Sequence, residues 1–353
     1  MSPLLTAVTP PAPSRGRRRY SFWPRLVAVL LASAVAALGA PDAQERRYTI
    51  AFANLTEEPG VTLEGTGFIG REVREGFVLA ARLLPVDLVL YDNRRDPKTA
   101  LDNAADAIRR KVDLYIQYHH DATTNATIGA RLHAANIPAL AINFPVPDAP
   151  LYTADNTAAG RIAGEALGEF AARAWRDRPV LAVIIGNVGA RDDRAPERIQ
   201  GVVDGLTRHR PAIRIVTLDT QGNPARGGEL LDRLVAGQAG RKLLIAALDD
   251  ASALAAKSAL EAAGRLADGA IVSHGADRSI HGGMSERKEI DPSNRGSIVI
   301  GSVAFYLDRY GYDVLPLAVR MLRGEPIPPR TVTRHRLITA ANVFVEYPPS
   351  DMN

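Results

Sequence analysis

The stretch "LLIAALDDASALAAKSALEAAG", residues 243–264, decides the fold class. It opens with six apolar residues that end at Leu248, which is typical of a strand buried on both faces of a sheet. Asp249 and Asp250 follow, and the Ala- and Leu-rich residues after them predict a helix. A buried strand that leads directly into a helix is the repeating unit of parallel α/β sheets.

The same unit recurs along most of the chain. Apolar strand-like runs occur at residues 48–55, 86–92, 112–118, 138–144, 179–186, 213–219, 242–248, 269–275 and 296–304. The segments between them have helical spacing, as where Leu167, Phe170 and Ala174 share one face. The alternation predicts a doubly wound α/β fold. Nine strands are many for one sheet, so we expect them to divide near residues 151–156 into two lobes.

Composition excludes several classes of protein. The chain has 353 residues, long enough for two domains of about 150 residues each. It has no cysteine, which excludes disulfides, thiol catalysis and cysteine-based zinc sites. The net charge of +4 is carried by residues 1–43, which hold five arginines and one aspartate. The remainder is neutral, so net charge gives no reason to expect a nucleic-acid partner.

Residues 1–43 predict a secretory signal peptide. A basic, Pro-rich start is followed by fifteen apolar or small residues, Leu26–Ala40, whereas a membrane-spanning helix needs about 20. We expect cleavage within residues 36–43 and a periplasmic product without stable membrane insertion. A retained anchor is the alternative. The stretch "RRRYSF", residues 17–22, leaves open whether export uses the general or the twin-arginine route.

Polar residues cluster where the predicted strands end. "VDLYIQYHHD", residues 112–121, ends in His119, His120 and Asp121, and similar groups follow the other strands. In parallel sheets the carboxyl ends of the strands line the ligand crevice. If the two lobes face each other, these ends converge on one cleft.

The paired histidines have four interpretations: metal ligands, a catalytic pair, ligand contacts or a solvated turn. Adjacent histidines point to opposite sides of an extended chain, and no His-x-x-x-His pair supports a metal. No Gly-x-Ser-x-Gly or His-Glu-x-x-His motif supports catalysis. We therefore expect no metal, no cofactor and no enzymatic activity. Asp121 or Thr123 is expected to cap the next helix, and His119 is favoured over His120 as a ligand contact.

Five blocks in a fixed order carry a family resemblance. They are "NIPALAIN" (136–143), "YTADNTAAGRIAGEAL" (152–167), "DDRAPERIQGVVDGL" (192–206), residues 243–264 and "LPLAVRMLRGEPIPPRTV" (315–332). Together they resemble the type I periplasmic substrate-binding proteins of the ribose/galactose-binding branch, whose fold is shared by LacI-type effector domains. The resemblance runs from about Tyr48 to Tyr347.

The resemblance implies two Rossmann-like lobes with parallel sheets, joined by a three-strand hinge that closes on a small ligand. The first lobe would comprise residues 44–153 and 303–330, and the second residues 154–302 and 331–353. The chain would cross between lobes near 153–156, 301–303 and 329–333.

The family's ligand positions are only partly retained. Asp249 replaces an asparagine, Asn143-Phe144 replaces an Asp-Arg pair, and Ser302 replaces the hinge glutamine. Pro196 stands where the family often has an arginine, which leaves Arg194 as a substitute. The residues that we expect to contact the ligand are Asn54, Glu57, Phe68, His119, His120, Asn143, Phe144, Arg194, Asp249, His274 and Ser302.

The function implied by the resemblance is capture of a small polar solute, with a sugar or polyol favoured, for delivery to an ABC permease. We expect the mature chain to act as a monomer. The alternatives are a periplasmic sensing module for a chemoreceptor or sensor kinase, and a binder of a non-sugar solute. Within the second lobe we expect Asp250 to cap its helix, Asp249 to contact the ligand and Arg198 to serve the structure.

Overall fold

The computed structural model describes residues 46–189, 194–281 and 298–348. The predicted signal peptide, residues 1–43, lies outside the described residues. From Arg47 onward the chain forms a single unit, and it contains two six-stranded sheets.

The first sheet is entirely parallel and has the strand order β11-β5-β4-β3-β1-β2. Its strands are β1 (Tyr48–Asn54), β2 (Val86–Asp92), β3 (Leu114–Gln117), β4 (Ala139–Ile142), β5 (Leu151–Thr153) and β11 (Arg330–Val332). All four residues of β3 are buried, as the apolar run at 112–118 predicts.

The second sheet has the order β12-β10-β9-β8-β6-β7, and only the β10–β12 pair is antiparallel. Its strands are β6 (Val180–Gly186), β7 (Arg214–Asp219), β8 (Lys242–Ala247), β9 (Gly269–Gly275), β10 (Val299–Ala304) and β12 (Arg336–Ile338). The first five strands of each sheet are arranged in the same spatial order, so each sheet is a doubly wound half of the same kind. The predicted fold class is confirmed, and each of the nine predicted runs contains a strand.

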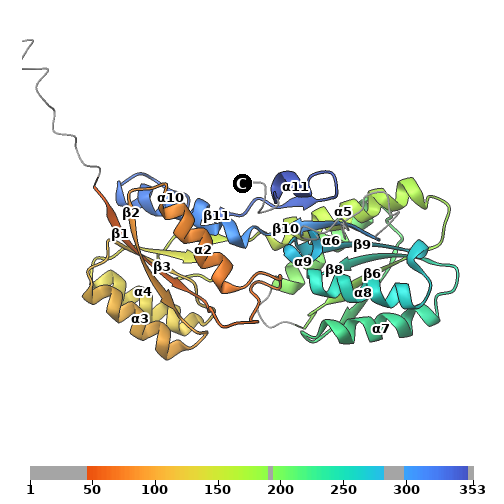
Figure 1. Ribbon diagram of the computed structural model, residues 1–353, viewed down its shortest axis with the longest axis horizontal. Coiled ribbons are helices and arrows are strands. Elements are labelled where there is room, and N and C mark those ends of the chain that lie inside the picture. Colours follow the sequence, from red (N-terminus) through yellow and green to blue (C-terminus); the bar gives the residue numbers. More distant parts are fainter. Residues whose placement is uncertain (1–45, 190–193, 282–297, 349–353) are drawn as a thin grey trace, which may run out of the picture. The chain divides into compact units, whose positions relative to one another are not determined.

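Helices pack on both faces of each sheet. The α-helices are α2 (Gly70–Ala81), α3 (Pro97–Arg109), α4 (Ala122–Ala134), α5 (Asn156–Ala174), α6 (Arg194–His209), α7 (Pro224–Ala236), α8 (Asp250–Ala262), α9 (Arg278–His281), α10 (Tyr310–Leu322) and α11 (Val343–Glu346). Two short 3-10 helices are η1 (Leu266–Asp268) and η2 (Leu307–Arg309). In Figure 1 α3 and α4 lie along one face of the first sheet, while α2 and α10 lie along the other.

The strand period of two separates the core of the first sheet into two layers. Ile50 and Phe52 of β1 join the core under α2 and α10, whereas Ala51 and Ala53 join the core under α3 and α4. All four side chains are fully buried. A strand covered on both faces must be apolar at every position, which is why the sequence shows continuous apolar runs.

Aspartates fix the helix starts at the carboxyl ends of the strands. Asp121 accepts a hydrogen bond from the Thr124 N–H at 2.7 Å and begins α4, and Asp155 accepts one from the Ala158 N–H at 2.9 Å and begins α5. The expected cap by Asp121 is confirmed. An N-cap of this kind stabilises a helix by about 1 kcal/mol.

The chain leaves the first sheet after β5 and returns to it at β11, after β10 of the second sheet and α10. The division into lobes at 153/154, 302/303 and 330/331 stays a prediction. Strands β10 and β11 lie across the last two of these boundaries.

Candidate ligand-binding site

His119 and His120 follow β3 and differ in their surroundings. His119 is fully buried, and its Nδ1 accepts a hydrogen bond from the Asp121 N–H at 3.1 Å. Its Nε2 has no hydrogen-bond partner among the described residues. Burial, with a smaller effect of His120, lowers the pKa of His119 to about 4, so the ring is neutral at pH 7. His120 is exposed and stacks on His119 with ring centroids 4.9 Å apart.

Asn143 and Phe144 follow β4 and lie beside the histidines. Asn143 has a left-handed backbone (φ 56°), and its side-chain amide donates to the Tyr118 hydroxyl oxygen at 3.4 Å. The half-buried Phe144 ring lies 6.2 Å from the Tyr118 ring and 6.3 Å from the His120 ring. The ends of β3 and β4 therefore bring together aromatic faces and hydrogen-bonding groups, the two kinds of contact that a sugar uses.

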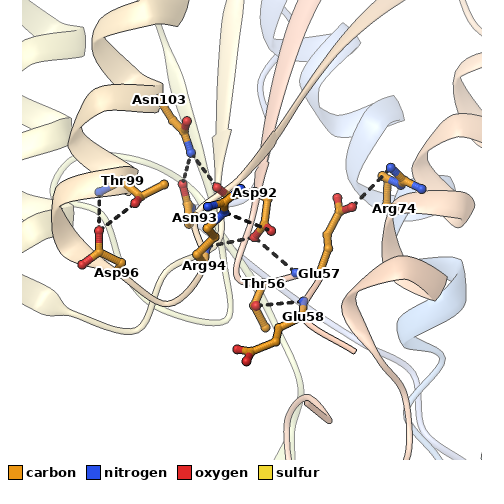
Figure 2. A network of polar contacts seen from close by, with 10 residues as sticks. All are labelled: Thr56, Glu57, Glu58, Arg74, Asp92, Asn93, Arg94, Asp96, Thr99 and Asn103. Carbon is orange, nitrogen blue, oxygen red and sulfur yellow. Dashed lines mark hydrogen bonds and ion pairs between the residues drawn. The ribbon is translucent and has the colours of Figure 1, made fainter. Parts of the chain in front are cut away.

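Asn54 and Glu57 follow β1 and hold the loop that begins there. The Asn54 amide donates to the Gly70 carbonyl at 2.8 Å, and the Glu57 carboxylate pairs with Arg74 at 3.2 Å. Burial raises the pKa of Glu57, while Arg74 opposes that shift. Figure 2 shows this pair and the Asp92 carboxylate, which accepts from the Glu57 N–H at 3.2 Å. The network joins the loop after β1 to the loop after β2.

Phe68 lies in the same loop and is buried in the core, 3% exposed. Two residues that the sequence analysis did not single out lie close by. The Tyr118 hydroxyl donates to the Glu64 carboxylate, and Glu64 is 9% exposed with a left-handed backbone (φ 57°). Glu64 lies in loop 56–67, which has neither a strand nor a helix pattern, and Tyr118 lies within the apolar run at 112–118, so neither residue stood out in the sequence.

In the second sheet the cap assignment is corrected. Asp249, not Asp250, is the N-cap of α8: its carboxylate accepts from the Ser252 N–H at 2.6 Å and the Ser252 hydroxyl at 2.8 Å. Burial raises the pKa of Asp249. The strand ends one residue earlier than the apolar run, so the cap position falls on the first aspartate rather than the second.

Asp250 is fully buried and accepts hydrogen bonds from two strands. The Ser302 hydroxyl donates to its Oδ1 at 2.7 Å, the Ser273 hydroxyl donates to the same oxygen, and the Asp277 N–H donates to Oδ2 at 2.9 Å. Burial, followed by the charge of Asp277, holds the pKa of Asp250 well above its usual range. The Ser302 hydroxyl also accepts a hydrogen bond from the Ala276 N–H at 2.9 Å, so it acts both as a donor and as an acceptor.

His274, at the end of β9, is also fully buried. Its Nδ1 lies 2.7 Å from the Ala247 carbonyl oxygen, to which the neutral ring donates. Burial, followed by the nearby positive charge of Arg198, lowers the pKa of His274 to about 3. These contacts give Asp249, Ser302 and His274 a structural role, while their contact with a ligand stays a prediction.

Arg198 of α6 connects the loop that contains Glu64 with residues beside the second sheet. It is 3% exposed, and each of its three nitrogens donates to another part of the chain. Nε and Nη2 donate to the Asn156 side chain at 3.1 and 2.8 Å, and Nη1 donates to the Leu248 carbonyl at 2.6 Å. Nη2 and Nη1 also donate to the Glu64 and Gly65 carbonyls at 3.0 and 3.3 Å. The structural role expected for Arg198 is therefore confirmed, and it reaches further than one helix.

Arg194 is the first residue of α6, and its side chain lies outside the described residues. Within residues 46–189, 194–281 and 298–348, no three His, Asp or Glu side chains are grouped as a metal site would require. In the same part of the chain no helix combines the length and the apolar character needed to cross a membrane.

Comparison with known proteins identifies the family. Residues 60–326 match the periplasmic binding protein domain. The chain belongs to this family. Its members are binding proteins rather than enzymes, and the resemblance inferred from the five sequence blocks is confirmed.

Solved structures agree with the family in fold. A Mycobacterium smegmatis protein in complex with β-D-fucofuranose has 21% identity and a TM-score of 0.64, over 86% of this chain and 95% of that one. A glucose-galactose binding protein from Geobacillus stearothermophilus has 19% identity and a TM-score of 0.60, over 84% and 98%. A sugar-binding protein from Bacillus halodurans has 18% identity and a TM-score of 0.67, over 85% and 100%. No curated protein sequence matches the chain.

Proposed function

We propose that this protein is an exported solute-binding protein that captures a neutral monosaccharide or polyol and delivers it to an ABC permease. The mature chain acts as a monomer in the periplasm after removal of the signal peptide. Closure of two lobes around the solute would present both lobe surfaces to the permease.

One observation carries the proposal: the group formed by His119, His120, Asn143 and Phe144 at the ends of β3 and β4. Sugars offer C–H faces that pack on aromatic rings and hydroxyls that pair with imidazole and amide groups. The buried His119 Nε2 supplies a polar atom that a ligand hydroxyl would satisfy. The sugars and polyols named for several solved structures of this fold support the same class of ligand.

A neutral solute is favoured over an anion. The guanidinium of Arg198 is engaged by Asn156 and by three backbone carbonyls, so it is not presented to an anionic group. Arg74 is likewise paired with the Glu57 carboxylate, so its charge is engaged within the chain. No contact among the described residues favours the sensing alternative.

A thermal-shift screen of the mature protein tests the proposal. Neutral monosaccharides and polyols form one set, and amino acids, nucleosides and sugar phosphates form the comparison set. A ligand at 100 times its Kd adds about 2.7 kcal/mol to the free energy of unfolding. We expect at least one neutral sugar or polyol to raise the melting temperature.

Two variants test whether the sugar-induced rise in melting temperature depends on the β3–β4 group. They are Phe144→Ala and, as a matched control, Phe344→Ala on α11. We expect the first to lose the sugar-induced shift and the second to keep it. Stabilisation by amino acids or nucleosides alone would contradict the proposed ligand class, and an undiminished shift in Phe144→Ala would remove the β3–β4 group from the site.

A further inference from the structure

Residues 62–69 form a hairpin, here called the docking arm. Thr62 and Ile69 pair as an antiparallel bridge, and the Leu63 N–H donates to the Phe68 carbonyl at 2.8 Å. The Thr66 N–H donates to the Leu63 carbonyl at 2.9 Å across a turn whose two central residues, Glu64 and Gly65, both have positive φ. Positive φ at both positions is the signature of a type I′ hairpin turn.

The turn uses an unusual residue at its first central position. Asn, Asp or Gly is preferred there, and a glutamate in the left-handed region costs about 1–2 kcal/mol. The Glu64 side chain compensates by accepting a hydrogen bond from the Tyr118 hydroxyl beside the first sheet. Leu63 and Phe68 are buried in the core, 2% and 3% exposed. The arm is therefore fixed to the part of the molecule that contains β3.

The tip of the arm contacts elements that flank the second sheet. Arg198 donates to the carbonyl oxygens of Glu64 and Gly65 at 3.0 and 3.3 Å. The same guanidinium is held by Asn156 of α5 and by the Leu248 carbonyl after β8. Hydrogen bonds from a buried charged donor are stronger than those between neutral groups, because solvent does not compete for them.

Gly67 shows how closely the arm approaches. A Cβ atom at Gly67 would lie 1.7 Å from Asp277 Oδ2 and 2.3 Å from Asp277 Cγ, and Asp277 follows β9 of the second sheet. The backbone of Gly67 does not have positive φ, so the lack of a side chain is required by this contact and not by its conformation. Thr66 likewise approaches Gly275, where an added Cβ would lie 3.4 Å from the Thr66 Cβ.

We propose that the docking arm holds the two lobes together in the absence of ligand. The inference rests on the proposed two-lobe function. In a protein that closes on its solute, contacts made by the solute to both lobes drive closure. Here the chain supplies such contacts itself, through Arg198 and through the fit of Gly67 against Asp277. The ligand-free protein is mainly in the docked arrangement, and solute enters during transient opening.

The test measures the distance between two spin labels on the ligand-free mature protein. Because the chain has no cysteine, Lys98→Cys on α3 and Glu229→Cys on α7 provide two exposed labelling sites without competing thiols. We expect one narrow distance distribution centred on the separation that the structure gives for these two positions. A broad or longer distribution that shortens only when a sugar is added would overturn the proposal.

Gly67→Ala adds a methyl group that clashes with Asp277 only when the arm is docked. Overpacking of this kind is expected to lower the ratio of docked to open molecules by about tenfold or more. Adding Asp277→Ala removes the two closest clashing atoms and should restore the short distance. Gly237→Ala, at the end of α7 with only an ordinary contact 3.7 Å away, is the control that should change nothing.

A Gly67→Ala distribution identical to that of the unmodified protein would also overturn the proposal. Every measurement is made without ligand. Failure of the arm to control the lobes is thereby distinguished from failure of the protein to bind a sugar, which the thermal-shift screen detects separately.

Discussion

Two buried histidines stand near the carboxyl ends of central strands, one in each sheet, and differ in what surrounds them. His119, after β3, keeps Nε2 without a hydrogen-bond partner among the described residues, and beside it lie the exposed His120 and the half-buried Phe144. His274, at the end of β9, also has an Nε2 without a hydrogen-bond partner among the described residues, but its ring is fully buried, its Nδ1 donates to the Ala247 carbonyl, and no exposed ring stacks on it. Nearby, Ser302 and Asp250 bond to each other.

The difference separates two tasks that similar residues perform at the ends of parallel strands. At the first sheet the side chains leave aromatic faces and polar atoms for a ligand. At the second sheet the carboxylates and hydroxyls satisfy one another and fix the starts of α8 and α9, which gives Arg198 and Asp277 stable positions for the docking arm. Variants at the second sheet should therefore alter stability more than affinity, and variants at the first sheet should alter affinity more than stability.

The largest effect is expected at Asp250. Asp250→Ala leaves the Ser273 and Ser302 hydroxyls and the Asp277 N–H without their common acceptor in a buried place. We expect the free energy of unfolding in urea to fall by about 3 kcal/mol. Asp250→Asn keeps an acceptor oxygen of the same size and should lose less than half of that. Equal losses in both variants would contradict the hydrogen-bonding explanation.

The pH dependence of stability is the next largest effect. The pKa of His274 is about 3 in the folded protein, below the value near 6.5 of an unfolded chain, so the unfolded state takes up the proton first. This contribution to stability is complete above pH 6.5 and is lost as the pH falls, by about 2 kcal/mol between pH 7 and pH 5. His119, with a pKa of about 4, acts in the same direction.

Urea titrations at several pH values measure this loss. His274→Asn keeps a donor for the Ala247 carbonyl and removes the proton uptake, so its stability should depend less steeply on pH over the same interval. An unchanged slope would show that His274 is not held neutral by burial.

The smallest effect is expected at Asp249. Asp249→Ala removes the N-cap of α8 and should lower the free energy of unfolding by about 1 kcal/mol. Asp249→Ser retains a capping oxygen and should lose only a few tenths of this amount, as thermal melts of the ligand-free protein would measure. A loss of 3 kcal/mol or more in Asp249→Ala would indicate a role beyond the cap.

The sequence was sufficient to predict the fold because strands buried on both faces must be apolar throughout. The runs that contain the central strands β1, β3, β4, β6, β8, β9 and β10 come close to this condition, whereas the edge strands β2 and β7 are only partly buried and include charged residues. Three further strands, β5, β11 and β12, have only three residues each, too few for a periodic pattern. Their pairing depends on contacts between segments far apart in the chain, such as Arg330 with Leu151.

The site was less predictable, because a strand end identifies a position and not the direction or partners of a side chain. Asp249 and Asp250 are adjacent in sequence, and their separate roles depend on where β8 stops and on hydroxyls contributed by β9 and β10. Glu64 and Arg198 are 134 residues apart, so no local pattern could associate them.

Calorimetric titration of the best neutral sugar or polyol into the mature protein tests the central claim most directly. Two variants are compared with the unmodified protein. His119→Gln changes a residue beside the first sheet, and Asp249→Ser changes one beside the second sheet while retaining the helix cap. We expect His119→Gln to weaken binding by about tenfold or more and Asp249→Ser to change the Kd less than about twofold. Weakened binding in Asp249→Ser together with unchanged binding in His119→Gln would contradict the central claim.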